Sequence, residues 1–168
     1  MQKYDGTTVS NWGIGTPASA ITSSLVTSGS LTATIGYLYV VCFSSSTSTH
    51  VGSPSPFLST KIVPTAQDIN VSGNTTIDPQ VNEVRVFRTA DGGSIYLEHP
   101  SSPVPYATWV SSGLTDSSAD TALLSTEAPL AGFNNRPPQS KSCAFYAGRI
   151  WTTSSSSVNF SGFEEINI

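Results

Sequence analysis

Charge is scarce in this chain of 168 residues, because only 11% of them are Asp, Glu, Lys or Arg. An ordinary soluble domain carries about 25%. The formal net charge is −4, and the seven basic residues are dispersed apart from Arg85 and Arg88. The sequence therefore lacks the basic patch that nucleic-acid-binding proteins use to neutralise phosphates. We expect no direct sequence-specific contact with nucleic acid.

Long apolar runs are also lacking. The longest one, residues 37–43, is far too short to span a membrane. The N-terminal residues contain no apolar segment of the kind found in signal peptides. We therefore expect no membrane contact and no secretory signal, so that the protein stays in the cytoplasm or leaves it within an assembly. The sequons at Asn70, Asn74 and Asn159 are then chance matches in a chain rich in Ser and Thr.

Only two cysteines are present, Cys42 and Cys143, which is too few for a disulfide framework. Both lie in apolar, strand-like runs, so we expect buried free thiols, with a single bridge between them as the alternative. Histidine is equally rare. His50 lies in a Ser/Thr loop and His99 precedes Pro100, and we expect both to be structural or solvated. No HExxH or CxxC spacing predicts a zinc site.

The acidic residues are few and form no recognisable site. Asp78 and Asp91 stand in turns, where side-chain hydrogen bonds to the local backbone account for them. Asp116 and Asp120 lack the spacing of a calcium-binding loop, so that site is a minor alternative. The segment Gly13-Ile-Gly15 lacks the third glycine, the lysine and the following helix of a phosphate-binding loop.

Glu83 and Glu98 are expected to face each other across a hairpin or to lie near Arg85, as solvated pairs. Nothing in the sequence singles out a glycosidase carboxylate pair among the acids. Aromatic residues that suggest a sugar-stacking surface are more economically core residues on strands; they are Tyr37, Tyr39, Tyr106, Trp109 and Trp151. We therefore predict no catalytic, cofactor-binding or metal-binding residue and no enzymatic activity.

What the chain does have is Ser and Thr, at roughly three residues in ten, with 13 Gly and 11 Pro scattered between apolar segments. No stretch of a dozen residues shows the apolar spacing of an amphipathic helix. Thr, Val, Ile and aromatic residues fit a pleated sheet, and Gly and Pro separate short segments. This composition predicts an all-β, antiparallel sandwich of about seven strands with almost no helix.

Residues 31–44 predict the main strand. Its odd positions are apolar throughout, whereas its even positions begin with Thr32 and Thr34 and become Leu38, Val40 and Cys42. The start of this strand is therefore expected to be half-exposed, and its end to be buried on both faces. A strand at the centre of a covered sheet has this pattern.

Residues 81–89 and 94–98 predict the clearest hairpin, with a tight turn at residues 90–93. Val84 and Val86 are expected on one face of the first arm, and Arg85 and Phe87 on the other. The other expected elements are strands at 20–26, 57–63, 69–71, 104–110, 142–152 and within 158–168, and one helical turn within 120–125. Residues 44–56 are expected to form a polar loop.

Three regions follow from this pattern: an irregular lead at 1–18, a β-sandwich domain at 19–133 and a C-terminal β arm at 134–168. The arm begins at Asn134-Asn-Arg-Pro-Pro138, where two prolines stiffen the chain. About thirty residues cannot bury the large apolar side chains of the arm by themselves. We expect a neighbouring copy to cover them, with the sandwich or another protein as alternatives. These side chains are Phe145, Tyr146, Ile150, Trp151, Phe160, Phe163, Ile166 and Ile168.

Several motifs together resemble the fibronectin-III-like region of head–tail connector and tail-tube (nozzle or DNA-stabilisation) β-propeller proteins of tailed bacteriophages. An aromatic-rich strand is followed by a polar loop and a Pro pair, and a Val/Arg-rich strand by a Gly turn. A Pro-Pro pair then precedes another aromatic strand. The motifs are Gly36-Tyr-Leu-Tyr-Val-Val-Cys-Phe43, Val51-Gly-Ser-Pro-Ser-Pro56, Val81-Asn-Glu-Val-Arg-Val-Phe-Arg-Thr89, Asp91-Gly-Gly-Ser-Ile-Tyr-Leu97, Pro137-Pro138 and Ala144-Phe-Tyr-Ala-Gly-Arg-Ile-Trp151, with the lead Tyr4-Asp-Gly6 and Trp12-Gly-Ile-Gly-Thr-Pro17.

The resemblance covers nearly the whole chain. The chain differs from the family in two places. The family often has an acidic residue in the loop where this chain has His50-Val-Gly52. In the family, a strand like residues 145–151 opens a β-propeller of several blades, which residues up to Ile168 do not complete. The expected form is therefore a short stand-alone homologue or one piece of a split protein, in which a second chain completes the propeller.

The resemblance implies a virion structural protein of the head–tail junction or tail, assembled in the host cytoplasm. It implies assembly by protein–protein contact, with other copies in a ring and with portal, adaptor or tail proteins as neighbours, and without a cofactor. The alternative is a sandwich-class binding module on a fibre, a capsid decoration or a cell-surface protein that recognises glycans or a host surface. A hydrolase is the least favoured interpretation.

Overall fold

The structure is a computed structural model, and it describes residues 2–4, 6–7, 9–11, 13–47, 50–131, 142–147, 149–153 and 158–160. The described part is all-β: its strands pair antiparallel, and only two short segments are helical. This confirms the predicted class. The chain divides into two compact units, Gly13–Asn135 and a second unit that joins Met1–Trp12 to Arg136–Ile168.

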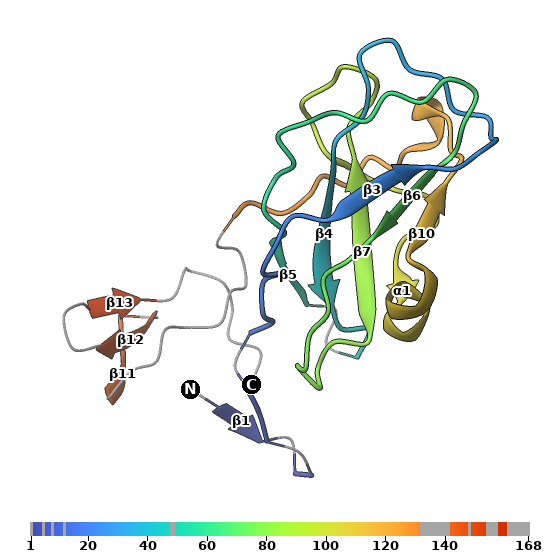
Figure 1. The fold of residues 1–168 in the computed structure, drawn as a ribbon. Coiled ribbons are helices and arrows are strands. Elements are labelled where there is room, and N and C mark those ends of the chain that lie inside the picture. The colour runs from blue at the N-terminus through green and yellow to red at the C-terminus, as the bar shows by residue number, and fades with distance from the viewer. Residues whose placement is uncertain are drawn as a thin grey trace. The chain divides into compact units, whose positions relative to one another are not determined.

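The larger unit contains two antiparallel sheets (Figure 1). One sheet has the order β5-β4-β7-β8, with β9 beside β7, and the other has the order β10-β6-β3. In Figure 1, β4 and β7 run side by side, and the strands of the second sheet cross them at an angle. The bounds are β3 (Thr22–Leu25), β4 (Tyr39–Ser44), β5 (Val51–Pro54), β6 (Ile69–Ser72), β7 (Glu83–Arg88), β8 (Leu97–Glu98), β9 (Val104–Pro105) and β10 (Leu114–Asp116).

The core lies between these two sheets. Alternate residues of a strand point to opposite faces, so every second residue of β4 and β7 reaches this layer. The second sheet contributes its own alternate residues, and all of these side chains are buried. The main members are Tyr39, Val41 and Phe43 from β4, Val84 and Val86 from β7, Ile69 and Val71 from β6, and Leu114 from β10.

β4 is buried on both faces, as its sequence predicts. Its outward-facing Val40 and Cys42 pack with Phe87 in a second, smaller apolar cluster. The strand begins at Tyr39 and not at residue 31. Gly36 causes this difference, because it has φ +99° and an added Cβ would collide with the carbonyl oxygen of Ile62. Between residue 31 and the start of β4, the chain makes only two isolated bridges, Thr32 with Thr65 and Tyr37 with Ile62.

The predicted hairpin is confirmed, because β7 and β8 pair antiparallel with Phe87 opposite Glu98. Its two faces are also as predicted, since Val84 belongs to the main core and Phe87 to the smaller cluster. Gly92 has positive φ in the turn. The second arm is shorter than predicted, and residues 124–128 run along its other side through backbone bonds to Tyr96 and Glu98.

Two predicted strands are wrong. Residues 57–63 form no strand, and β5 lies earlier, within the predicted polar loop at 44–56. Residues 104–110 contain only the short β9, after which α1 (Tyr106–Ser112) begins. The helix forms because Tyr106 and Trp109 are three residues apart and share one helical face. Trp109 is buried there, and its Nε1 donates to the carbonyl of Gly73 at 2.7 Å.

The other elements of the larger unit follow the sequence more closely. β3 lies within the predicted strand at 20–26, and β6 covers the predicted strand at 69–71. The helical turn expected within 120–125 is the 3₁₀ turn η1 (Asp120–Ala122). β10 was not predicted, because three residues are too few for a periodic signal.

The smaller unit contains two separate sheets. β1 (Gln2–Tyr4) and β2 (Val9–Asn11) form a hairpin, so the prediction of an irregular lead is wrong for these residues. β11 (Ser142–Tyr146), β12 (Arg149–Thr153) and β13 (Val158–Phe160) form an antiparallel meander. The predicted strand at 142–152 is therefore two strands, which turn at Ala147 with φ 51°. β13 confirms the further short strand.

The predictions for Pro137-Pro138 and for Phe163, Ile166 and Ile168 lie outside the described residues.

Candidate functional site

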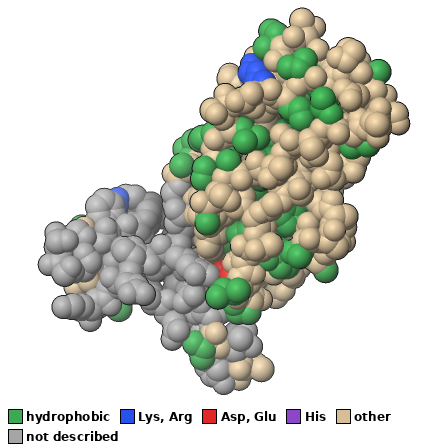
Figure 2. Space-filling model, viewed as in Figure 1, with side chains coloured by type: hydrophobic (Ala, Val, Ile, Leu, Met, Phe, Trp, Pro, Cys, Tyr) green, Lys and Arg blue, Asp and Glu red, His purple; other side chains and the backbone are tan. Residues whose placement is uncertain are grey.

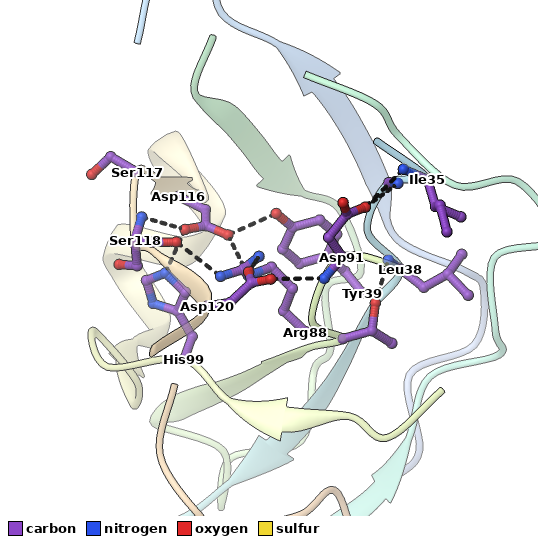
Figure 3. Close-up of polar contacts among 12 residues, drawn as sticks. Ile35, Leu38, Tyr39, Arg88, Asp91, His99, Asp116, Ser117, Ser118 and Asp120 are labelled. Carbon is purple, nitrogen blue, oxygen red and sulfur yellow. Dashed lines mark hydrogen bonds and ion pairs between the residues drawn. The ribbon is translucent and has the colours of Figure 1, made fainter. Parts of the chain in front are cut away.

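The most concentrated group of polar side chains is a buried cluster, shown in Figure 3 and named here the polar cluster. It consists of Tyr39, Arg88, His99, Asp116 and Asp120. Four of these side chains are fully or almost fully enclosed, and only Asp120 is partly exposed. They come from β4, β7, the end of β8, β10 and η1, so the cluster connects the two sheets of the larger unit.

Arg88 is the one member of the polar cluster that always carries a positive charge. Its Nε lies 3.0 Å from Oδ2 of Asp116 without the alignment of a hydrogen bond. One terminal nitrogen donates to Oδ1 of Asp120 and the other to the carbonyl of Ser118, each at 2.8 Å. The Tyr37 ring covers the guanidinium at 4.2 Å, which is a cation–π distance. Two carboxylates therefore hold one buried cation.

Asp116 is the centre of the polar cluster. It accepts hydrogen bonds from the phenol of Tyr39 at 2.7 Å, from Nε2 of His99 at 2.9 Å and from the backbone of Ser118 at 2.8 Å. Burial raises the pKa of Asp116, but the His99 bond, the charge of Arg88 and the Tyr39 bond together outweigh it, so the pKa lies below its ordinary value. The carboxylate is ionised at neutral pH.

His99 and Asp116 resemble two members of a catalytic triad, but the geometry leaves no free base. Nδ1 of His99 accepts the backbone N–H of Ser101 at 3.1 Å, so Nε2 carries the hydrogen that it donates to Asp116. Both ring nitrogens are thus occupied, and the side chain is 1% exposed. The hydroxyl of Ser102 donates to Glu98 instead. This pair positions the backbone and presents no nucleophile to solvent.

Asp91 extends the polar cluster to the surface. Its carboxylate accepts the backbone N–H groups of Thr34, Ile35 and Gly36 at 2.8, 2.8 and 2.7 Å. These three bonds lower the pKa of Asp91 below its ordinary value. Its own N–H donates to Asp120 at 2.8 Å. The prediction that the side chain of Asp91 bonds to its own turn is therefore wrong, because it holds the loop at residues 34–36.

A second candidate is a shallow hollow of about 380 Å³ between β6 and α1. It is lined by backbone and by uncharged side chains, so it offers hydrogen bonds and no ionisable group. The amide of Asn70 donates to the carbonyl of Ser112 at 3.1 Å across it. The lining residues are Asn70, Ser72, Gly73, Asn74, Thr75, Trp109, Val110, Ser111, Ser112 and Gly113.

The structure separates the two cysteines. Cys42 is buried and free, as predicted, and burial raises the pKa of its thiol. Cys143 is also free but exposed, so the prediction of a buried thiol is wrong there. The reason is that β11 has both of its faces exposed, which an apolar sequence does not reveal.

The predicted acids fall into different environments. Glu98 does pair with Arg85, at 3.0 Å, but it is buried and not solvated, and its hairpin neighbour is Phe87 and not Glu83. Asp78 accepts the backbone N–H of Gln80, as a turn residue does. Within the described ranges, no three His, Cys, Asp or Glu side chains are placed to hold a metal ion.

The remaining predicted residues are placed as follows. Tyr37, Tyr39 and Trp109 are buried, which agrees with a core role and not with a sugar-stacking surface. Tyr106 and Trp151 are half-buried. His50 is exposed in its loop, and Gly13-Ile-Gly15 places Ile14 in the core. No helix in the described ranges is long and apolar enough to cross a membrane.

The polar cluster is not among the predicted sites, although the sequence carries a signal for it. In β7 the core-facing positions are Val84 and Val86, and the same alternation places Arg88 inside. Leu114 and Asp116 show the same relationship in β10. A charged residue at a core-facing position of a strand predicts a buried partner of opposite charge.

The geometry defines an all-β protein whose polar interior is closed to solvent. Neither a protein-family model, nor a curated protein, nor a solved structure matches the chain. The function is therefore inferred from its own residues.

Proposed function

We propose that this chain is a structural protein of a tailed-bacteriophage virion, at the head–tail junction or in the tail. It acts by protein–protein assembly, with copies of itself in a ring and with portal, adaptor or tail proteins as neighbours. It is assembled in the host cytoplasm, and it has no catalytic role, no cofactor and no direct contact with nucleic acid. The larger unit is then an immunoglobulin or fibronectin-III-like sandwich.

The sandwich proposal is supported by the two antiparallel sheets and by the core between them. The virion setting is supported by the sequence resemblance alone. The described part of the larger unit has eight strands, β3 to β10, and the helix α1 between β9 and β10 is an addition to a simple sandwich.

The assembly proposal is supported mainly by the distribution of charged and apolar side chains between the interior and the surface. The charged side chains of the polar cluster are enclosed except for Asp120, which is one-third exposed, whereas large apolar side chains lie at the surface. Figure 2 shows hydrophobic groups scattered over one face of the larger unit among very few charged ones. Depletion of charged residues is a feature of the core of protein–protein interfaces, so the low charge of this surface supports assembly. In the larger unit, these side chains include Ile35, Phe57, Val63, Ile77 and Ile95.

The test is to locate the protein in particles. We expect mass spectrometry of purified virions to detect the chain in a fixed ratio to the portal protein, and immunogold labelling to place it at the head–tail vertex or the tail. Absence from washed particles contradicts the proposal. Deletion of residues 139–168 then tests the arm, and an unchanged mass by light scattering excludes it as an assembly element.

A binding module is the second candidate, and the hollow beside α1 favours it. Its amide, hydroxyl and backbone groups suit a neutral polyhydroxylated ligand such as a glycan. Ser112→Trp fills the hollow, whereas Ser101→Trp places the same side chain at an exposed position away from its lining. Binding on a glycan array that Ser112→Trp abolishes and Ser101→Trp retains favours this candidate, and no binding by the unaltered chain rejects it.

A further inference from the structure

β11 is a sheet edge that nothing described in its own unit covers. It lies at the end of the order β11-β12-β13, and all five of its residues are exposed. Phe145 is 68% exposed and Tyr146, on the other face, is 73% exposed. A small sheet needs a covered hydrophobic face for stability. Among the described residues, neither the two faces nor the outer edge of this strand has a partner.

The edge also lacks the features that prevent strands from pairing between molecules. Natural edges carry charged residues, prolines or bulges for this purpose. Ser142–Tyr146 reads Ser-Cys-Ala-Phe-Tyr, with no charge and no proline. Its register with β12 is continuous from Ser142 opposite Thr153 to Tyr146 opposite Arg149, so no bulge interrupts it. Among the described residues, no strand pairs with the outer edge of β11, so its backbone is open to a fourth strand.

The order of side chains in β11 is complementary to its own reverse, because small residues stand at one end and large aromatic ones at the other. In an antiparallel pair of two identical strands centred on Ala144, Ser142 lies opposite Tyr146 and Cys143 lies opposite Phe145. Each large side chain then has a small one across the interface, and the two alanines meet at the two-fold axis. The absence of charge means that the axis brings no like charges together. We propose that β11 pairs with β11 of a second copy in this register, which joins two meanders into one continuous sheet.

The occupant is a second copy because an identical strand in antiparallel register places a small side chain opposite each large one and adds no charge. The contact goes beyond the proposed function, since it is isologous and joins copies two by two, whereas a ring needs a head-to-tail contact. An edge of five residues lies at the low end of interface sizes. We therefore expect a dissociation constant on the order of micromolar or weaker.

Disulfide trapping in the full-length chain tests the register. Cys143→Ser/Ala144→Cys places two thiols opposite each other, with Cα atoms about 4.5–5.5 Å apart, within the range that a disulfide needs. The unaltered chain is the matched control, because its Cys143 faces Phe145 of the other copy. We expect at least about tenfold more cross-linked dimer from the variant under mild oxidation. Equal cross-linking, or none from the variant, overturns the register.

Charge at the axis tests the contact itself. Ala144 is exposed, so Ala144→Lys leaves the fold intact, but it places two lysines opposite each other in the dimer. Val158→Lys adds the same charge to the exposed face of β13, away from the proposed contact. At about 100 µM we expect sedimentation to show dimer for the unaltered chain and Val158→Lys and monomer for Ala144→Lys. A monomeric unaltered chain, or equal loss in both variants, overturns the proposal. Ring assembly that survives Ala144→Lys separates this contact from the proposed function.

Discussion

Arg88 on β7 and Asp116 on β10 join the two sheets of the larger unit through an ion pair that is closed to solvent. The guanidinium Nε lies 3.0 Å from Oδ2, and neither side chain is exposed. A buried pair stabilises a protein little compared with apolar residues of the same shape, because both ions lose their hydration. Removal of one partner is costly, because it leaves the other charge buried without compensation.

Asp116→Asn is therefore expected to lower the free energy of unfolding by about 3–5 kcal/mol. The substitution keeps the shape but removes the charge that faces Arg88. Urea denaturation measures the loss, and Asp120→Asn is the matched control. Because Asp120 is one-third exposed, its loss is expected to be about 1 kcal/mol. Equal losses for the two variants would contradict the central role of Asp116.

The same carboxylate predicts acid sensitivity. The pKa of Asp116 is lowered in the folded protein, so its contribution is fully present above the unfolded pKa of about 3.9. As pH falls further, through the folded pKa, the unfolded chain takes up the proton first and the contribution is lost. The difference in unfolding free energy between the unaltered chain and Asp116→Asn should narrow over this range. A difference that stays constant down to about pH 2 would show that Asp116 does not titrate.

Val41→Asp is expected to abolish folding, and Tyr39→Ala to do the same. Val41 is 0% exposed in the main core, so the new carboxylate is buried without a partner, at a cost of several kcal/mol. Tyr39→Ala leaves a cavity and removes a hydrogen bond to Asp116. Ile95→Asp is the control, since Ile95 is exposed. Melting of either core variant within a few degrees of the unaltered chain would contradict these positions.

The two thiols should differ in reactivity. Burial holds the pKa of Cys42 far above its ordinary value, so its thiolate does not form in the folded chain. Cys143 is exposed on β11. A chromogenic disulfide reagent is expected to titrate one thiol in native buffer and two in denaturant. Cys143→Ser should remove the native signal, and a native signal that persists in this variant would place Cys42 at the surface.

The sequence predicts the centre of the fold better than its edges. β4 and the β7–β8 hairpin are predictable because their apolar positions alternate over enough residues to identify a period. Short elements such as β10, with three residues, carry no such signal. The helix α1 was interpreted as a strand because its segment is rich in aromatic and β-branched residues, which are common in strands. The spacing of three between Tyr106 and Trp109 fits a helix instead, and the bond from Trp109 to the carbonyl of Gly73 shows that this face is buried.

The polar cluster was missed for a different physical reason. Its members are far apart in the chain, and Asp116 meets Tyr39 across 77 positions. Each residue alone has an ordinary explanation at the surface or in a turn. Only the pairing of two sheets brings these charges together, and that pairing is a long-range property. The alternation in β7 marks Arg88 as core-facing, but it does not identify the carboxylates that compensate it.

The pairing of β4 with β7 also has a consequence during synthesis. β4 leaves the ribosome with both faces apolar, and its partner follows only after roughly 40 more residues. At about 5–20 residues per second, β4 remains on the order of seconds without β7 beside it. A short, uncharged β-forming segment is prone to aggregate in that interval. Slow translation between residues 44 and 83 is therefore expected to lower the soluble yield, whereas slow translation after Arg88 is not.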